Sequence, residues 1–324
     1  MDFSVNAFDA IDQHSIRAAS VFLRSHFPES PLVPMLCEEQ TTAYAKLECD
    51  VPTSAFKIRG GLVYFHWLQA AHPNVDTVVA ATRGNHGQSV AMAAAANGYR
   101  CRIVVPIGNS PLKNQAMQRL GAELIEHGGD FAESLEFAAQ IASDDTTHFV
   151  PSFDWKLVLG VATYGYELFS AAPQIDAVYV PIGLGSGICG TLAARRATSQ
   201  DARIIGVVAA NAPVYASSFA AGEIVSNAEI PRTIADGVAC RVPHPAAFAT
   251  ILRHVDEITM ASEDQIRGGI AELFRRTGRR VEGAGALAWA ACRRQLGRFR
   301  HPAVIVSGGN IDDETFDRSL QQVA

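Results

Sequence analysis

Short apolar, β-branched runs alternate with helical patterns along most of this chain, and this alternation limits the fold more than any other feature. From residue 77 onward the strand-like runs lie at 77–82, 101–106, 122–126, 147–150, 177–182, 203–210 and 302–309. The helical patterns between them include an Ala-rich stretch, a helix expected after Gly190, and a capping box at Ser262 and Gln265. Strands that are connected through helices run parallel and are covered on both faces. The sequence therefore predicts an α/β protein with doubly wound parallel sheets.

Bulk composition excludes several classes of protein. A chain of 324 residues is long enough for two domains, and its net charge of -6 offers no basic surface to nucleic acid. No apolar run reaches the length of a membrane span, and the N-terminal stretch MDFSVNAFDAIDQHS carries acidic residues where a signal peptide carries basic ones. The 6 cysteines show no CxxC or metal-ligand spacing. We therefore expect a cytoplasmic protein with reduced cysteines, no metal, and no nucleic-acid or membrane partner.

The glycine-rich loop VPIGLGSGICG follows a predicted strand and leads into a helix. Ligands of parallel sheets bind at the carboxyl ends of strands, and the N–H groups of such a loop converge on an anion. Gly185, Gly187 and Gly190 also match the dinucleotide fingerprint GxGxxG. The next strand, however, ends in Ala210 and Asn211, without the acid that would bind a ribose. We therefore favour a phosphate site without a ribose site; a tight turn with packing glycines is the alternative.

A second loop, TRGNHGQ, also joins a predicted strand to a helix. Its free N–H groups suit a carboxylate, and Asn85 offers both a donor and an acceptor. Arg83 could clamp a second carboxylate or could be an ordinary solvated arginine, and the residue types leave both open. His86, at a helix start, is interpreted as structural rather than as a general base. A third loop, Ser307 to Asn310, offers a hydroxyl and close backbone approach after the last strand.

The stretch SAFKIRGG places Lys57 among small, aromatic and apolar residues. An ammonium that is poorly solvated has a lowered pKa and becomes a usable amine. The stretch therefore indicates a lysine suited to Schiff-base chemistry.

Taken in order, the segments PTSAFKIRGG, TRGNHGQ, GLGSG, TIADGV, EGAGA and SGGN resemble those of fold-type-II pyridoxal-phosphate enzymes. This is the family of threonine/serine dehydratases and serine racemases, and the resemblance extends from Lys46 to Asn310. It implies the tryptophan synthase β-subunit-like fold with two doubly wound parallel-sheet domains, and a homodimer. The large cofactor-binding domain would comprise residues 1–76 and 153–324, and the small substrate-carboxylate domain would comprise residues 77–152.

The resemblance also implies a role for each candidate site residue. Lys57 would be the catalytic residue, binding the aldehyde of pyridoxal 5'-phosphate and removing the α-proton of an amino-acid substrate. Phe56 would pack beside the cofactor ring, Asn85 would hydrogen-bond its 3-oxygen, and Ser307 would meet its nitrogen. The phosphate would be held by the backbone of Gly183, Leu184, Gly185, Ser186 and Gly187. The substrate carboxylate would lie on Thr82, Arg83, Gly84 and His86.

Two departures from the racemase pattern bear on the reaction. Arg83 replaces the serine that acts as the second acid/base in racemases, and arginine is a poor proton abstractor. Val208 and Val214 stand where racemase-like members have acidic ligands for a divalent ion, so no metal site is expected. Glu282 of EGAGA could lie near the cofactor ring or could cap the helix that starts there, and Asp236 would form a turn; neither is expected to be catalytic.

The resemblance therefore implies an ammonia-lyase that dehydrates a β-hydroxy-α-amino acid of the threonine/serine type to a 2-oxo acid and ammonia. Arg83 motivates an alternative hypothesis about the substrate, in which the enzyme dehydrates a hydroxyaspartate-like or otherwise modified amino acid. The residues also leave open a β-replacement enzyme and a non-catalytic protein that binds pyridoxal phosphate or an amino acid.

Overall fold

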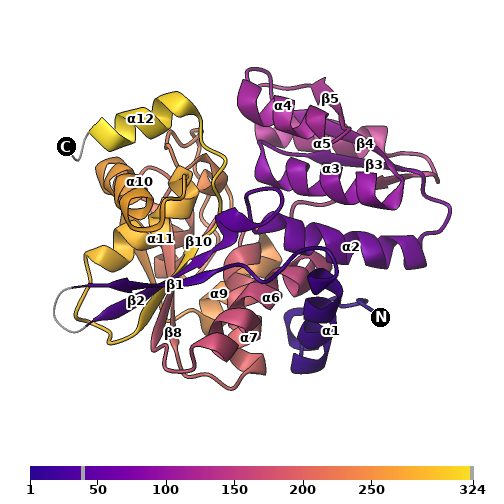
Figure 1. Ribbon diagram of the computed structural model, residues 1–324. Coiled ribbons are helices and arrows are strands. Elements are labelled where there is room, and N and C mark those ends of the chain that lie inside the picture. The colour runs from indigo at the N-terminus through magenta and orange to yellow at the C-terminus, as the bar shows by residue number, and fades with distance from the viewer. Residues whose placement is uncertain (38–40, 322–324) are drawn as a thin grey trace.

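The computed structural model describes residues 1–37 and 41–321 as an α/β protein with two sheets (Figure 1). The larger sheet has the order β1-β2-β10-β7-β8-β9, and the smaller sheet has the order β5-β4-β3-β6. The strands of the larger sheet are β1 (Leu32–Leu36), β2 (Thr42–Leu47), β7 (Ala177–Pro181), β8 (Arg203–Ala209), β9 (Glu257–Ala261) and β10 (Pro302–Val306). Those of the smaller sheet are β3 (Thr77–Ala81), β4 (Arg100–Val105), β5 (Glu123–Glu126) and β6 (Thr147–Phe149). All paired strands run parallel except β1, which is antiparallel to β2 at the edge of the larger sheet.

Helices connect the strands and cover both sheets (Figure 1). The α-helices are α1 (Gln13–Arg24), α2 (Lys57–Ala71), α3 (Asn85–Asn97), α4 (Pro111–Arg119), α5 (Phe131–Ile141), α6 (Trp155–Ala171), α7 (Ser186–Ala197), α8 (Val214–Ala221), α9 (Pro245–His254), α10 (Glu263–Thr277), α11 (Gly283–Arg293) and α12 (Asp313–Gln321). The short 3-10 helices of the described residues are η1 (Phe8–Ala10), η2 (Glu48–Asp50) and η3 (Asp236–Val238). The predicted capping box at Ser262 and Gln265 is present at the start of α10, whereas α7 begins at Ser186, earlier than the predicted start after Gly190.

We call β3 to β6 with α3, α4 and α5 the smaller lobe, and the larger sheet with its covering helices the larger lobe. Helix α2 contacts both α3 of the smaller lobe and α6 of the larger lobe. The smaller sheet is built from strands between Thr77 and Phe149, whereas the larger sheet draws strands from both flanking parts of the chain. The predicted domain limits, 1–76 with 153–324 and 77–152, stay a prediction.

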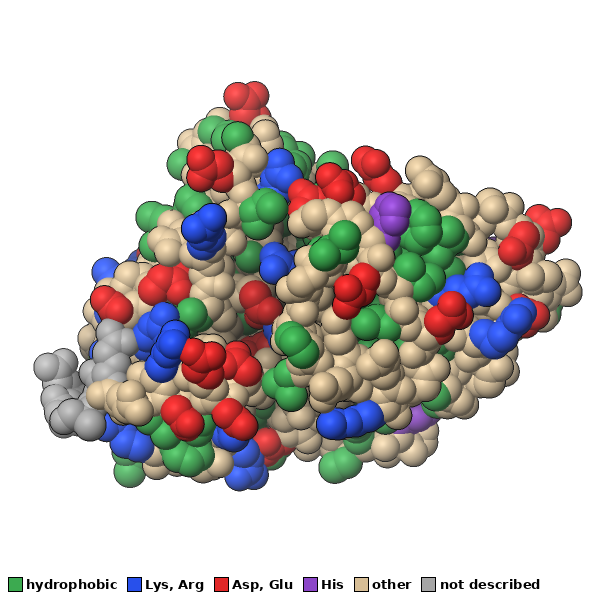
Figure 2. Space-filling model, turned by 90° about the horizontal axis from the view of Figure 1, so that it is seen from above, with side chains coloured by type: hydrophobic (Ala, Val, Ile, Leu, Met, Phe, Trp, Pro, Cys, Tyr) green, Lys and Arg blue, Asp and Glu red, His purple; other side chains and the backbone are tan. Residues whose placement is uncertain are grey.

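The molecular surface shows no large patch of a single charge on the face drawn in Figure 2. Basic and acidic side chains lie interspersed there, with apolar side chains between them. Among residues 1–37 and 41–321, no helix is both long and apolar enough to cross a membrane.

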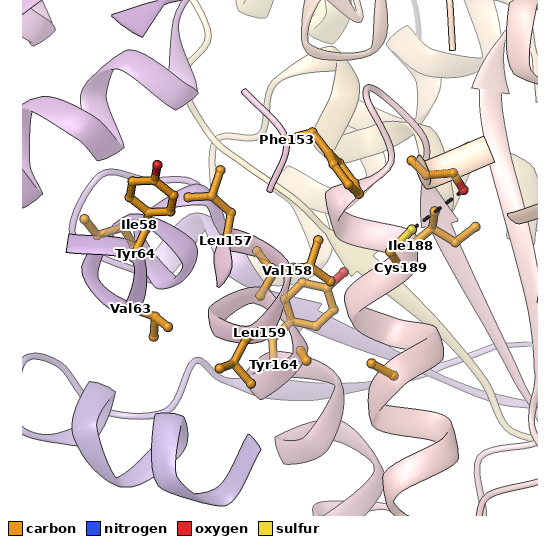
Figure 3. Packing of buried hydrophobic residues seen from close by; sticks show 14 of the residues in the cluster. Ile58, Val63, Tyr64, Phe153, Leu157, Val158, Leu159, Tyr164, Ile188 and Cys189 are labelled. Atoms are coloured by element: carbon orange, nitrogen blue, oxygen red, sulfur yellow. Dashed lines mark hydrogen bonds between the residues drawn. The ribbon is translucent and has the colours of Figure 1, made fainter. Parts of the chain in front are cut away.

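The central strands of the larger sheet are buried on both faces, which explains their continuous apolar sequences. In β7, Ala177 and Tyr179 belong to the core cluster that includes α11, whereas Val178 and Val180 belong to the cluster that includes α7. Helices α2, α6 and α7 pack together and contribute side chains to the cluster that contains Val178 and Val180. Their apolar side chains gather in Figure 3, where Tyr64 extends from α2, Tyr164 from α6 and Ile188 from α7.

Two glycines let the backbone of α2 lie very close to its neighbours. A Cβ atom at Gly160 of α6 would lie 2.2 Å from the carbonyl oxygen of Arg59, and one at Gly61 would lie 2.2 Å from Oγ of Ser89 in α3. No side chain fits in either space, so α2 is fixed against both helices. The first residue of this tightly held helix is Lys57.

Candidate active site

Backbone contacts place Lys57 near the carboxyl end of β10 in the larger sheet. Ala55 forms an isolated antiparallel bridge with Gly308, and the N–H of Phe56 donates to the carbonyl oxygen of Ser307 at 3.1 Å. The loop after β10 therefore holds the segment before α2. Predicted site residues from opposite ends of the sequence become neighbours in this way.

The amine of Lys57 has a hydroxyl partner and no carboxylate partner. Its Nζ donates to Oγ of Ser186 at 2.9 Å and lies 5.2 Å from the centroid of the Phe56 ring. Within the described part of the chain, no acidic side chain forms an ion pair with it. Burial of the ammonium lowers the pKa of Lys57 to about 8. The site thus provides an amine that loses its proton closer to neutral pH than an ordinary lysine does.

The loop from Gly183 to Gly187 joins β7 to α7, and two tyrosines fix its backbone. Tyr164 donates to the carbonyl oxygen of Gly187 at 2.6 Å, and Tyr215 donates to that of Leu184 at 3.0 Å. Gly185, at φ 103°, is in the left-handed region that favours glycine.

The N–H groups of this loop are available to a ligand. None of the N–H groups of residues 183–187 is paired with an acceptor among the residues that the structure describes. The first N–H groups of α7 also lack intrahelical partners, and a helix N-terminus attracts an anion. A Cβ atom at Gly187 would lie 3.6 Å from Cζ of Phe56, so a larger residue there would fill space beside this ring. The loop therefore fits a phosphate held close to Phe56 and Lys57.

Ser307 has a free hydroxyl in the same region. The side chain follows β10, is 5% exposed, and forms no hydrogen bond to any described residue. A buried hydroxyl that lacks a protein partner suits a ligand atom that accepts or donates one hydrogen bond. The ring nitrogen predicted to meet Ser307 is an atom of this kind.

The structure distinguishes among the residues predicted to bind the substrate carboxylate. Oγ1 of Thr82 accepts hydrogen bonds from the N–H groups of Gly84 at 3.0 Å and Gly87 at 3.1 Å, so its oxygen shapes the loop. His86 is buried, and this burial together with the nearby charge of Lys57 lowers the pKa of His86 to about 3. The imidazole is therefore neutral at physiological pH, in agreement with a structural role. Arg83 is exposed and has neither an ion pair nor a hydrogen bond within residues 1–37 and 41–321.

Asn85 is held at both ends of its amide. Its Nδ2 donates to Oε1 of Glu282 at 2.7 Å, and its Oδ1 accepts from Nδ2 of Asn310 at 2.8 Å. Glu282 is the N-cap residue of α11, but its side chain forms no capping hydrogen bond to that helix. Its carboxylate instead accepts from Asn85 and lies near Lys113.

Sequence reasoning missed Lys113. It lies in α4 and forms an ion pair with Asp236 of η3, and its Nζ is 4.0 Å from Oε2 of Glu282. Asp236 was expected only to form a turn. The available signal was the position of Lys113 in the helix that follows β4, because the carboxyl ends of parallel strands meet at one edge of a sheet.

These contacts suit a ligand with a phosphate group, an electrophilic carbon that reacts with an amine, and a ring nitrogen. Gly183 to Gly187, Lys57 and Ser307 supply the three matching groups around Phe56. Among the described residues, no group of three or more His, Cys, Asp and Glu side chains could hold a metal ion.

Known proteins resemble this chain along most of its length. Residues 24–308 match the family described as pyridoxal-phosphate dependent enzyme. The chain is 35% identical over 303 residues to an L-threonine ammonia-lyase of Geobacter sulfurreducens, covering 93% of this chain and 73% of that protein. It is 32% identical over 311 residues to the catabolic L-threonine dehydratase TdcB of Escherichia coli, covering 94% and 93%. Among solved structures, the processed form of threonine deaminase isoform 2 from Solanum lycopersicum is 25% identical with a TM-score of 0.86, covering 96% of this chain and 93% of that one.

Proposed function

This chain belongs to the family of pyridoxal-phosphate dependent enzymes, and we propose that it is an ammonia-lyase that dehydrates a β-hydroxy-α-amino acid of the threonine or serine type. The products would be a 2-oxo acid and ammonia. The predicted family, fold and cofactor are confirmed by the similarities. The observation that carries the proposed reaction is the placement of Lys57, whose amine lies beside the glycine loop with a hydroxyl partner only.

The residues around Phe56 fit pyridoxal phosphate. When bound, this cofactor supplies an aldehyde that condenses with amines and a ring that withdraws electrons from the substrate α-carbon. We expect the N–H groups of residues 183–187 to hold its phosphate and the hydroxyl of Ser307 to hydrogen-bond its ring nitrogen. Because a hydroxyl carries no negative charge, Ser307 would not hold that nitrogen protonated as an aspartate would. The weaker electron withdrawal favours elimination over transamination.

Lys57 acts in this proposal both as the amine that holds the cofactor and as the base for the α-proton. An amine with a pKa of about 8 is neutral in about one tenth of the molecules at pH 7. An unperturbed lysine, with a pKa of about 10.4, is neutral in fewer than about one in a thousand. The buried position therefore raises the reactive fraction by more than about a hundredfold.

The loop before α3 suits the substrate carboxylate. The N–H groups of Gly84 and Gly87 donate to Oγ1 of Thr82, whereas those of Asn85 and His86 have no acceptor among the described residues and could bind an anion; the hydroxyl hydrogen of Thr82 is also not used by the loop. A racemase needs a second acid/base on the opposite face of the substrate. Arg83 occupies the sequence position of the serine that, by the resemblance, acts as this second acid/base in racemases, and an arginine is a poor proton abstractor, which supports elimination rather than racemisation.

A second candidate is the dehydration of an amino acid with an acidic side chain, such as hydroxyaspartate. The lack of any partner for Arg83 in the described chain favours it, because a free guanidinium beside the carboxylate loop could bind a second carboxylate. Arg83→Ser should then lower kcat/KM for threo-3-hydroxyaspartate about 10- to 100-fold while changing that for L-threonine little. Equal effects on both substrates would exclude this candidate.

The deciding test is a visible absorption spectrum of the purified protein before and after addition of L-threonine, L-serine and threo-3-hydroxyaspartate separately. We expect a yellow band that is absent in Lys57→Ala, and release of ammonia with the true substrate. Entry of an added thiol into the product would indicate β-replacement instead. A band that no amino acid changes would favour the non-catalytic binding protein. The homodimer and the cytoplasmic location stay predictions.

A further inference from the structure

Lys113 reaches from the smaller lobe into the larger lobe. It belongs to α4, yet its ammonium forms an ion pair with Asp236 of η3 and lies 4.0 Å from Oε2 of Glu282, which precedes α11. The side chain is buried, and its stem covers Gly84, where a Cβ atom would lie 2.5 Å from Cδ of Lys113. One side chain thus connects the carboxylate loop with two acids of the opposite lobe.

The contact continues through Glu282 to Asn85. Oε1 of Glu282 accepts from Nδ2 of Asn85, and Asn310 donates both to Oδ1 of Asn85 and to the carbonyl oxygen of Thr53. The Asn85 amide is therefore oriented from both ends. One of its N–H bonds remains for the cofactor oxygen that Asn85 is proposed to contact.

The charge of Glu282 depends on Lys113. Oε2 of Glu282 is buried without a hydrogen bond among the described residues, and the ammonium of Lys113 is the cation beside it. Burial raises the pKa of Glu282 to about 7, against the opposing effects of Lys113 and the Asn85 hydrogen bond and with a further rise from Asp236. Burial also disfavours the charge of Lys113, but Asp236 and Glu282 outweigh it and raise the pKa of Lys113.

We propose that Lys113 is a positioning residue, whose ammonium favours the ionised form of Glu282 as an acceptor for Asn85 and thereby fixes Asn85 for the cofactor. The proposal rests on the proposed function, because it takes Asn85 to face the cofactor ring. Without the ammonium, Glu282 is left with Asp236 as its charged neighbour, and its ionised fraction at pH 7 falls below the roughly one half that a pKa of about 7 gives it in the parent. The neutral acid is a weaker acceptor for Asn85, and Asn85 loses its fixed orientation.

Non-covalent cofactor affinity tests this role without relying on turnover. Pyridoxal phosphate is titrated against the full chain carrying Lys57→Ala, with tryptophan fluorescence as the signal, and the unmodified chain is titrated in parallel. Adding Lys113→Met should weaken binding about tenfold at pH 7. The difference should fall below about threefold at pH 9, because Glu282 ionises again as the pH rises. Asp236, Arg83 and Asp312 also lie near Lys113, so the affinity of each variant is expressed, at each pH, as a ratio to the affinity of the parent chain.

Three further variants separate the charge from simple loss of structure. Lys113→Arg keeps the charge and should bind within about twofold of the parent. Glu282→Gln fixes a neutral side chain, and Lys113→Met should add little to it. Lys156→Met is the matched control, because Lys156 is also a buried lysine beside a carboxylate, Asp154, and should leave affinity unchanged.

The outcomes are distinct. Equal affinity of Lys113→Met and its parent at pH 7 would overturn the inference and leave the proposed function intact. A weakening that is the same at pH 7 and pH 9 would also overturn it, since a lost structural contact does not titrate with Glu282. Failure of the unmodified chain to bind pyridoxal phosphate would contradict the proposed function itself. If Lys113→Met does not fold, the affinities of Glu282→Gln and Lys113→Arg for pyridoxal phosphate at pH 7 decide instead. Weaker binding by Glu282→Gln than by Lys113→Arg supports the inference, and equal affinity overturns it.

Discussion

Arg59, two residues after Lys57, provides the sharpest test of how the larger lobe holds α2. Its guanidinium is fully buried and forms ion pairs with Glu48 at 2.7 Å and with Glu167 at 2.7 Å. Lys46 pairs with Glu167 at 2.5 Å. The substitution Arg59→Met keeps much of the volume and removes the charge. Glu167 then retains Lys46, but Glu48 is left as a buried carboxylate without a cation.

The variant has two ways to accommodate Glu48, and both are costly. Keeping a buried carboxylate unpaired costs about 3–5 kcal/mol. Protonating a glutamate at pH 7 costs about 3.7 kcal/mol, because its ordinary pKa lies about 2.7 units lower and each unit is about 1.4 kcal/mol. We therefore expect Arg59→Met to lower the free energy of unfolding by about 3–4 kcal/mol at pH 7.

The loss should depend on pH with a definite sign. The pKa of Glu167 is lowered despite burial, because Arg59 and Lys46 stabilise its charge, so this stabilisation is present above the unfolded pKa and is constant between pH 5 and 7. The cost of protonating an unpaired glutamate with an ordinary unfolded-state pKa falls with pH, to about 1 kcal/mol at pH 5. The difference between wild type and variant should therefore shrink by about 2.7 kcal/mol from pH 7 to pH 5.

Urea unfolding followed by tryptophan fluorescence measures this loss, since Trp67 in α2, Trp155 in α6 and Trp289 in α11 all lie outside the smaller lobe. Arg298→Met is the matched control, because Arg298 pairs with Glu257 at the surface at 2.6 Å and should cost less than about 1 kcal/mol. The reasoning is refuted if Arg59→Met costs no more than this control, or if its cost is the same at both pH values.

Two further predictions concern the site itself. Gly185→Ala places a side chain at φ 103°, with its Cβ 2.6 Å from Cβ of Ala247, so it should weaken binding of pyridoxal phosphate at least about tenfold but leave unphosphorylated pyridoxal unaffected; equal losses by titration would contradict the phosphate role. The rate at which the protein condenses with pyridoxal phosphate, followed by stopped-flow absorbance, should rise with pH around a midpoint near 8, since burial lowers the pKa of Lys57; a midpoint above about 10 would show an unperturbed amine.

The sequence predicted the elements whose signals are local. The runs at 77–82 and 203–210 became β3 and β8 within one residue at either end, because a strand covered on both faces must be continuously apolar. The antiparallel edge strand β1 carried no such signal, since Met35 alone among its residues is buried and the strand includes Pro34. The start of α7 was placed too late, because glycines were interpreted as loop residues although Gly187 and Gly190 lie inside the helix.

The site residues likewise divide into those with a local sequence signal and those whose contacts are distant in the sequence. Residues in glycine-rich loops after strands, such as Gly185 and Ser307, could be predicted because the residues that define such a loop are adjacent in the sequence. The partners of Asn85 and Lys113 could not, because Glu282 lies 197 positions from Asn85 and Asp236 lies 123 positions from Lys113. Contacts at such separations depend on how the two lobes meet, and a single sequence contains no periodicity that reports it.

The lysines of this chain show how sequence and structure combine in the argument for function. Lysine occurs only at positions 46, 57, 113 and 156, so arginine supplies the other basic side chains. The structure pairs Lys46 with Glu167, Lys113 with Asp236 and Lys156 with Asp154, and buries all three. Lys57 alone among them has a hydroxyl instead of a carboxylate, so its ammonium has the least to lose on deprotonation. An aldehyde offered to this protein therefore meets one half-buried lysine side chain that forms no ion pair and is readily neutral, and borohydride trapping should label Lys57 in preference to the other three.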